Sequence, residues 1–178
     1  MARFFWVDLE MTGLDEKIHK IIEVAVVITD QNFEIKEQYE QVVFQPQSEL
    51  DLMDEWCKKT HGASGLTEAI PRGKHLTEVE QEVLSIINRH YRKNDRVILC
   101  GNSVGNDQRF IIAHMPLLAK RLHYRIVDVS SFKEIFRSKW GIKFEKKNAH
   151  RAVDDILESI RELQSYLQLV HIESNDPS

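Results

Sequence analysis

Near its N-terminus the chain reads Phe4-Phe5-Trp6-Val7-Asp8-Leu9-Glu10-Met11-Thr12-Gly13, an apolar run that ends in two carboxylates. The run is short and turn residues follow it at once, which is typical of a buried strand rather than a helix. Side chains alternate along a strand, so Asp8 and Glu10 point the same way at its end. Two like charges beside a buried surface repel each other and lose hydration, so a proton or a cation must separate them. Taken alone, the pattern also fits a strand that simply runs out into solvent.

The size and composition of the chain indicate one globular domain. It has 178 residues, of which 42% are hydrophobic and 29% charged. A chain of this length supports one buried core, so we expect a single domain over residues 1–170. Residues 171–178 are polar and aperiodic, and we expect a flexible tail there. The first apolar run is interrupted by acids before it could act as a signal peptide, and no stretch approaches membrane-spanning length. These features predict a cytoplasmic protein without membrane contact.

The charge of the chain limits the partners it can hold. The formal net charge is -4 at pH 7. Proteins that bind long nucleic acids neutralise many phosphates with Lys and Arg, and an acidic chain is poorly equipped for that. If the substrate is a nucleic acid, it should therefore be short or held through metal ions.

The strand pattern predicts an α/β fold. Residues 21–29 are rich in β-branched side chains, a turn at residues 30–32 follows, and a third strand ends near residues 41–44. Residues 96–101 and 124–129 read as a fourth and a fifth strand that alternate with helices. We expect a central mixed sheet of five strands, three antiparallel and then parallel ones, flanked by helices.

Four helices have clear boundary signals. Asp54 is placed to cap a helix that Gly62 closes, and Thr77 with Glu80 forms a capping-box pattern before the next helix. A later helix over residues 131–140 should stop at Gly141. The last helix is expected from residue 149 or 151 to about residue 169, because its apolar residues recur with a helical period.

Further acidic residues stand where α/β sheets keep their sites. Asp107 follows the fourth strand, near the start of a helix and at the carboxyl end of the sheet, although alone it reads as an ordinary first-turn aspartate. Asp154 and Asp155 flank the apolar stripe of the last helix, one on each side of it. At 3.6 residues per turn they are about equally far from its centre, so periodicity does not say which one faces the site. His150, just before or in the first turn, would ordinarily be an exposed polar residue.

Taken together, these pieces resemble a known family. Asp8-x-Glu10, Asp107 and His150-x-Ala152-x-x-Asp155 resemble the three motifs of the RNase H-like 3'-to-5' exonucleases that use four acids and a histidine. Five stretches of the chain resemble the oligoribonucleases in sequence: residues 7–14, 54–61, 101–103, 124–130 and 150–155. The resemblance covers about residues 3–170. It implies an RNase H-like exonuclease domain that degrades very short RNA oligonucleotides, dinucleotides in particular, to mononucleotides.

The resemblance also implies the chemical roles of five residues. Asp8, Glu10, Asp107 and Asp155 match the metal ligands of the family, and the preference for Asp155 over Asp154 rests on this match. Phosphodiester hydrolysis needs an activated water and stabilised charge on two oxygens, which two divalent ions about 4 Å apart can supply. A ligand set of carboxylates favours Mg²⁺ or Mn²⁺ over Zn²⁺. His150 matches the catalytic base, and an unperturbed pKa near 6.5 suits it to take a proton at cellular pH.

The substrate-binding residues of the family match seven further positions. Leu14 and Trp56 match an apolar wedge against the bases, and His61 matches a residue near the scissile phosphate. The cap on the 5' phosphate is matched by Ser103, Arg125 and Ser130. Tyr124 matches a tyrosine given to the catalytic site of the neighbouring subunit, so a homodimer is implied. Without the resemblance, Trp56 reads as a core aromatic residue and Arg125 as a surface charge.

Two other functions are compatible with the same motifs. One is a DNA-directed or proofreading exonuclease, which a long basic groove would favour and which the acidic net charge disfavours. The other is a catalytically dead RNase H-like binding module, which the presence of all five chemical residues disfavours. Release of 3' mononucleotides from short RNA and short DNA separates these functions.

Overall fold

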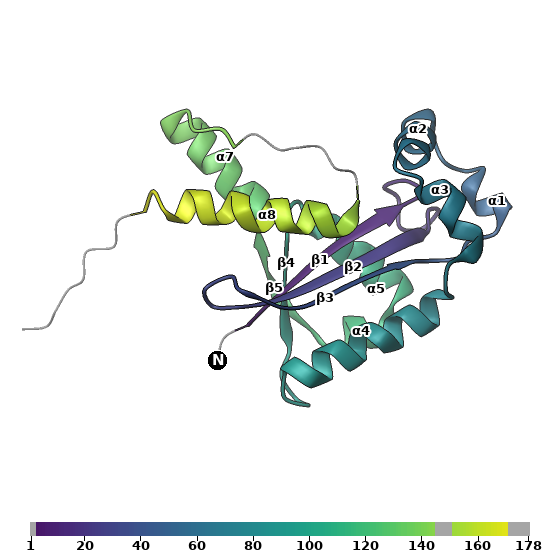
Figure 1. Ribbon diagram of the computed structural model, residues 1–178, viewed down its shortest axis with the longest axis horizontal. Coiled ribbons are helices and arrows are strands. Elements are labelled where there is room, and N and C mark those ends of the chain that lie inside the picture. Colours follow the sequence, from purple (N-terminus) through teal and green to yellow (C-terminus); the bar gives the residue numbers. More distant parts are fainter. Residues whose placement is uncertain (1–2, 145–150, 171–178) are drawn as a thin grey trace, which may run out of the picture.

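The chain forms a mixed five-stranded sheet flanked by helices, as the sequence predicts. The computed structural model describes residues 3–144 and 151–170 (Figure 1). The order of the strands in the sheet is β3-β2-β1-β4-β5. Strands β1, β2 and β3 are antiparallel, and β4 is parallel to both β1 and β5. The strands are β1 (Arg3–Met11), β2 (Ile21–Asp30), β3 (Ile35–Val42), β4 (Val97–Gly101) and β5 (Leu122–Asp128).

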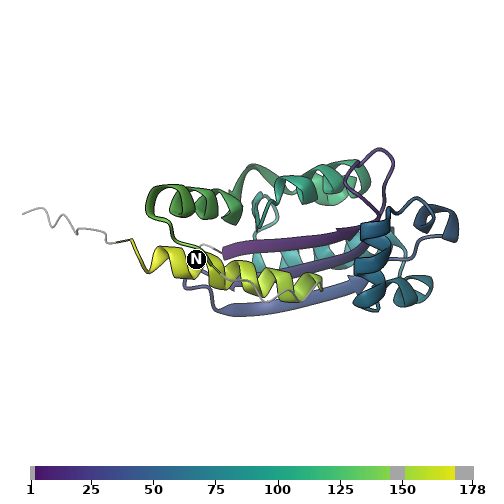
Figure 2. The same cartoon turned by 90° about the horizontal axis from the view of Figure 1, so that it is seen from above.

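The alternation of side chains along β1 divides the core into two layers. Phe5, Val7 and Leu9 pack with residues of α4 (Leu76–His90) and α5 (Gly105–His114) on one face of the sheet. Trp6 packs on the other face with residues of α8 (Ala152–Leu167), which runs across the strands (Figures 1 and 2). Asp8 shares the face of Trp6 because the side-chain period is two. The acidic end of β1 therefore faces α8.

Most of the predicted helix boundaries are confirmed. Asp54 caps α2 (Glu55–Ala63), and its carboxylate accepts a hydrogen bond from the Cys57 amide at 2.7 Å. Helix α7 (Val129–Trp140) ends at Gly141, whose φ of 69° is the left-handed conformation that favours glycine. Four short helices were not predicted: α1 (Gln47–Leu50), α3 (Leu66–Ala69), η1 (Ile70–Arg72) and α6 (Pro116–Ala119). None of the helices in the two described ranges combines the length and apolarity needed to cross a membrane.

Two boundary predictions are wrong. Gly62 lies inside α2, and the left-handed glycine that follows the helix is Gly65, with φ of 75°. Helix α4 begins at Leu76 rather than after Thr77, because Glu78 reaches back and accepts a hydrogen bond from the His75 amide at 3.0 Å. A capping interaction of the expected kind is present, but it is formed two residues earlier than the sequence pattern suggests.

Candidate active site

Three carboxylates from two distant segments meet at the end of β1. Asp8 and Glu10 come from β1, and Asp155 comes from the first turn of α8. One ligand oxygen from each of them lies within 4.8 Å of the others, and all three side chains are partly buried. The neighbouring Asp154 is exposed. The folded chain thus places Asp155 at the acidic group, which the helical period alone could not decide.

Asp107 is held against the same strand from the other side. Strand β4 pairs with only the first part of β1 and ends at Gly101, where the chain turns into α5. Beyond this point the amide of Leu9 donates a hydrogen bond to Asp107 Oδ1 at 2.9 Å. The turn brings the two strands close together, since a Cβ on Gly101 would lie 2.8 Å from the carbonyl oxygen of Val7. Asp107 is only 5% exposed, and its charge is among those that raise the pKa of Glu10.

The electrostatics of this group suit a bound cation. Burial, together with the charges of Asp155, Glu23 and Asp107, raises the pKa of Glu10 to about 8. Burial also raises the pKa of Asp107 to about 7. A raised pKa means that the ionised carboxylate is disfavoured at its position in the fold. A divalent cation, which prefers oxygen ligands, stabilises the ionised form. The residues present therefore fit a divalent metal site.

A cavity opens beside the acidic group. Its volume is about 550 Å³, and Glu10 is part of its wall. Leu14 and Trp56, the predicted apolar wedge, both line it and are 68% and 65% exposed. The lining residues are Glu10, Met11, Gly13, Leu14, His19, Asp54, Trp56, Cys57 and His61. Apolar surface with a few polar groups is typical of a site for a small ligand.

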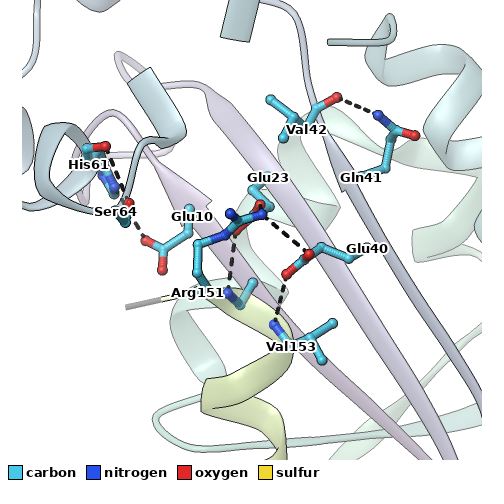
Figure 3. A network of polar contacts seen from close by, with 10 residues as sticks. Glu10, Glu23, Glu40, Gln41, Val42, His61, Ser64, Arg151 and Val153 are labelled. Atoms are coloured by element: carbon cyan, nitrogen blue, oxygen red, sulfur yellow. Dashed lines mark hydrogen bonds and ion pairs between the residues drawn. The ribbon is translucent and has the colours of Figure 1, made fainter. Parts of the chain in front are cut away.

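His61 lies at the boundary between the cavity and the acidic group. Its side chain is buried, with Nε2 3.1 Å from the carbonyl oxygen of Met11. Its Nδ1 is 3.8 Å from a carboxylate oxygen of Glu10 (Figure 3). The structure thus brings His61 to Glu10, from an element about 50 residues further along the chain.

His19 lines the cavity, although no sequence pattern predicts a role for it. Its Nδ1 accepts a hydrogen bond from the amide of Asp15 at 3.1 Å. The ring covers Gly13, where a Cβ would lie 2.5 Å from Nε2 of the imidazole. Glycine at position 13 therefore leaves room for His19 in the wall of the cavity. The position of His19 depends on the loop between β1 and β2, which has no periodicity that could predict it.

The predicted phosphate cap is only partly assembled. Asp128 Oδ1 accepts hydrogen bonds from the amide of Ser103 at 2.9 Å and from the hydroxyl of Ser130 at 2.7 Å. The carboxylate of Asp128, which lies in the family-like stretch 124–130 but has no predicted role, therefore holds the two serines together. Arg125 lies on the exposed strand β5, and its Nε donates to the hydroxyl of Tyr124 at 2.9 Å.

Tyr124 lies far from the acidic group of its own chain. It is 77% exposed on β5, an edge strand of the sheet. Leu99 pairs with both Phe5 and Ile126, so Tyr124 is level with the beginning of β1. At about 3.3 Å per residue, roughly 20 Å of strand separates that level from Glu10. His150 lies outside the described residues, next to Arg151 at the N-cap of α8.

Comparisons with known proteins agree with this geometry. The RNase T family model, described as an exonuclease, matches residues 5–163. An oligoribonuclease of Marinobacter nauticus is 44% identical over an alignment of 172 residues that covers 92% of this chain and 93% of the relative. An oligoribonuclease of Francisella tularensis is 45% identical over an alignment of 167 residues that covers 92% of this chain and 93% of the relative. The chain belongs to the oligoribonuclease family of exonucleases. The oligoribonuclease resemblance of the sequence motifs is thereby confirmed over nearly the whole chain.

Solved structures confirm that the chain has the predicted RNase H-like fold. Exonuclease I of Methylocaldum szegediense superposes with a TM-score of 0.73 at 12% identity over 94% of this chain. Exonuclease I of E. coli, in a zinc-bound complex with single-stranded DNA, gives a TM-score of 0.72 at 12% identity over 92% of this chain. The chain spans about 40% of each of these longer proteins. At this level of identity the likeness concerns the fold alone.

Proposed function

We propose that the chain is a 3'-to-5' exoribonuclease that hydrolyses very short RNA oligonucleotides, dinucleotides in particular, to mononucleotides. One observation carries the proposal: Glu10 belongs both to the group of three carboxylates and to the wall of the 550 Å³ cavity. A nucleotide in the cavity would thus present its phosphodiester beside the carboxylates. Membership in the oligoribonuclease family supports both the reaction and the substrate class.

Two divalent cations, Mg²⁺ or Mn²⁺, are the proposed cofactors. Asp8, Glu10, Asp107 and Asp155 would hold them, because these carboxylates are buried or half-buried and supply only oxygen atoms. Bound cations of this kind activate a water molecule and stabilise charge on the phosphate oxygens. The contribution of the protein is to fix four ligands from β1, α5 and α8 around one phosphodiester. The hydrogen bond from the amide of Leu9 fixes Asp107 in this way.

His150 is the proposed general base. It precedes Arg151, the N-cap of α8, in the sequence and lies five residues before Asp155. An imidazole at that position can take the proton of the attacking water, a contribution of about 10² to 10⁴ in rate. His150→Ala should then reduce kcat by that amount and leave the affinity for Mn²⁺ unchanged, which calorimetric titration measures. Loss of Mn²⁺ affinity in the variant would instead make His150 a ligand.

The ends of the substrate are proposed to supply most of the binding energy. Leu14 and Trp56 would contact the bases, and His61, beside Glu10, would lie near the scissile phosphate. Ser103 and Ser130, which share Asp128 as acceptor, would receive the 5' phosphate together with Arg125. An acidic chain gains little from a long phosphate backbone, so contacts at the ends favour short RNA.

The assembly is proposed to be a cytoplasmic homodimer in which Tyr124 completes the catalytic site of the partner subunit. Two observations support a role in trans. Tyr124 is largely exposed on an edge strand, and the strand register places it far from the carboxylates of its own chain. An exposed aromatic side chain of this kind is common at protein interfaces.

The proposed function is tested by the products that the chain forms from matched substrates. The chain would be incubated with Mg²⁺ or Mn²⁺ and one of three substrates: a 5'-phosphorylated RNA dinucleotide, a longer RNA or a 5'-phosphorylated DNA dinucleotide. The release of mononucleotides would be followed. Fast release from the diribonucleotide is expected. A preference for DNA would support the proofreading alternative, which the oligoribonuclease relatives and the acidic net charge do not favour. No release from any substrate would support a dead binding module.

A further inference from the structure

Two more acidic residues lie on the face of the sheet that carries the proposed site. Glu23 is opposite Glu10 in the pairing of β1 with β2, so their side chains share a face, and Glu23 is 0% exposed. Glu40 on β3 lies opposite Ala25 in the next strand pair. With Asp8 and Glu10, these residues make three adjacent strands acidic at one end. Such a face repels itself unless positive charge is brought to it.

Arg151 brings that charge. Its Nη2 donates to a carboxylate oxygen of Glu23 at 2.9 Å and of Glu40 at 3.2 Å (Figure 3). One guanidinium therefore bridges two strands. A planar guanidinium can hold two carboxylates at once, which the single ammonium of lysine does with less geometric definition.

The same two carboxylates also hold the start of α8. The amide of Ala152 donates to Glu23 at 3.3 Å, and the amide of Val153 donates to Glu40 at 3.3 Å (Figure 3). These are first-turn amides, which have no acceptor within their own helix. Carboxylates at a helix N-terminus also interact favourably with the helix dipole. Four contacts of Arg151, Ala152 and Val153 thus fix the first turn of α8 on β2 and β3.

Asp155 is attached directly to this turn. Its amide donates to the carbonyl oxygen of Arg151 at 3.0 Å, the first hydrogen bond of the helix beyond the N-cap. A shift of the turn on the sheet would therefore carry the Asp155 carboxylate with it. Asp8 and Glu10 would stay, because they belong to β1. The spacing of the three carboxylates is set by how α8 begins.

We propose that Glu23, Glu40 and Arg151 form a clamp that positions Asp155 against Asp8 and Glu10, and that Arg151 is a positioning residue for the reaction. This inference rests on the proposed function for its effect on catalysis. Its effect on metal binding does not depend on which nucleic acid is cut. Groups that orient metal ligands in this way commonly contribute 10- to 100-fold to metal affinity or activity.

The test compares Arg151→Gln and Arg151→Lys with the parent chain. Calorimetric titration with Mn²⁺ on the full chain without substrate is the first readout, and kcat and KM for a 5'-phosphorylated diribonucleotide at saturating Mn²⁺ are the second. Arg151→Gln should weaken Mn²⁺ binding and lower kcat, each by about 10- to 100-fold, with little change in KM. Arg151→Lys should recover part of both losses, because it restores the charge but not the planar guanidinium.

A matched control is available on the same strand. Arg89 of α4 pairs with Glu37 of β3, and both residues belong to a network separate from Glu23 and Glu40. Arg89→Gln also removes an arginine from an ion pair with β3, so it should lower the melting temperature without changing Mn²⁺ affinity or kcat by more than about twofold. The same result for Arg151→Gln would overturn the clamp and leave Arg151 as an ordinary structural ion pair.

A milder variant tests the clamp even if Arg151→Gln does not fold. Glu40→Gln removes one carboxylate of the clamp at a partly exposed position and should weaken Mn²⁺ binding by less than Arg151→Gln does. In the double variant the two losses should be less than additive, because both changes break the same contact. Additive losses would overturn the clamp. If the parent chain binds Mn²⁺ but releases no mononucleotide from any substrate, the proposed function fails while the titrations still decide the clamp.

Discussion

Glu10 and Glu23 lie directly opposite each other on the antiparallel strands β1 and β2, with Glu23 fully buried and Glu10 at the wall of the cavity. Burial raises the pKa of both carboxyls, and the charge of Glu23 contributes to the rise at Glu10. Their partners differ. Glu23 is bound by Arg151, whereas Glu10 faces the other carboxylates of the proposed metal site. Glu23 thus anchors the start of α8, whereas Glu10 belongs to the proposed metal site.

The first prediction concerns stability without metal. Glu10 keeps its proton up to a pH of about 8 in the folded chain but loses it near 4.5 when unfolded. Between these values the folded state binds more protons than the unfolded state, so stability must fall as pH rises. We expect the melting temperature in a chelator to decrease from pH 5 to pH 8.5. Saturating Mg²⁺ should raise the melting temperature more at pH 8.5 than at pH 6, because metal binding requires deprotonated carboxylates.

Glu10→Gln serves as the control for that prediction. The amide does not titrate, so the metal-free melting temperature should decline less steeply with pH than in the parent chain. The same slope in both chains, measured by differential scanning calorimetry, would show that Glu10 does not carry the dependence.

The second prediction uses two adjacent aspartates of α8. Asp155 belongs to the group of three carboxylates, whereas Asp154 is exposed. Asp155→Asn should therefore reduce turnover of a diribonucleotide by at least about 100-fold, since changes one contact further from a metal already cost up to that much. Asp154→Asn should retain turnover within about twofold. Equal losses in initial-rate assays would mean that the assignment of the ligand is wrong.

The sequence predicted the fold more completely than the site. The strands could be predicted because β-branched runs such as residues 21–29 report burial locally. Asp8 and Glu10 were likewise predictable as one pair from the strand period. Local patterns failed where the outcome depends on tertiary contacts: Asp154 and Asp155 are equivalent by helical period, and the docking of α8 is what brings Asp155 to the other two carboxylates.

Other parts of the site have no local signal at all. Arg151 meets Glu23 across 128 residues of sequence, and this contact requires the register of β2 and the start of α8 together. The sequence predicts no role for Asp128, because this residue acts by holding two serines from distant segments, Ser103 after β4 and Ser130 in the first turn of α7. The position of His19 follows from a loop, where sequence pattern is weakest. Long-range pairing is what a single sequence does not display.

The third prediction tests Tyr124 in trans. A Tyr124→Ala chain keeps Asp8, and an Asp8→Ala chain keeps Tyr124, so a hybrid dimer has one intact site and one site lacking both residues. With random pairing in an equal mixture, half of the dimers are hybrid and roughly a quarter of the parent activity should return. Subunit exchange would be confirmed with a tagged chain. If exchange occurs and the mixture is no more active than its two components, Tyr124 does not act in the partner's site.

The last prediction concerns the length of the substrate. An acidic chain gains little affinity from a long phosphate backbone, so binding energy must come from the substrate ends. Base stacking on the exposed ring of Trp56 can contribute about 1 to 3 kcal/mol, and charge-assisted hydrogen bonds from Arg125 to a terminal 5' phosphate add to it. A 5'-phosphorylated diribonucleotide can occupy the phosphate cap and the carboxylate site at once. A longer RNA would have to pass Ser103 and Ser130.

We therefore expect 5'-phosphorylated diribonucleotides to be cut faster than RNAs of about seven or more nucleotides, in time courses at limiting enzyme. Arg125→Ala should narrow this difference, because it removes a contact that only a terminal phosphate can make and so slows the diribonucleotide more than the longer RNA. Arg137→Ala, which removes an exposed arginine from α7, is the matched control and should leave the ratio of the two rates unchanged. If Arg125→Ala slows both substrates equally, Arg125 is an ordinary surface charge and the length preference must come from elsewhere in the site.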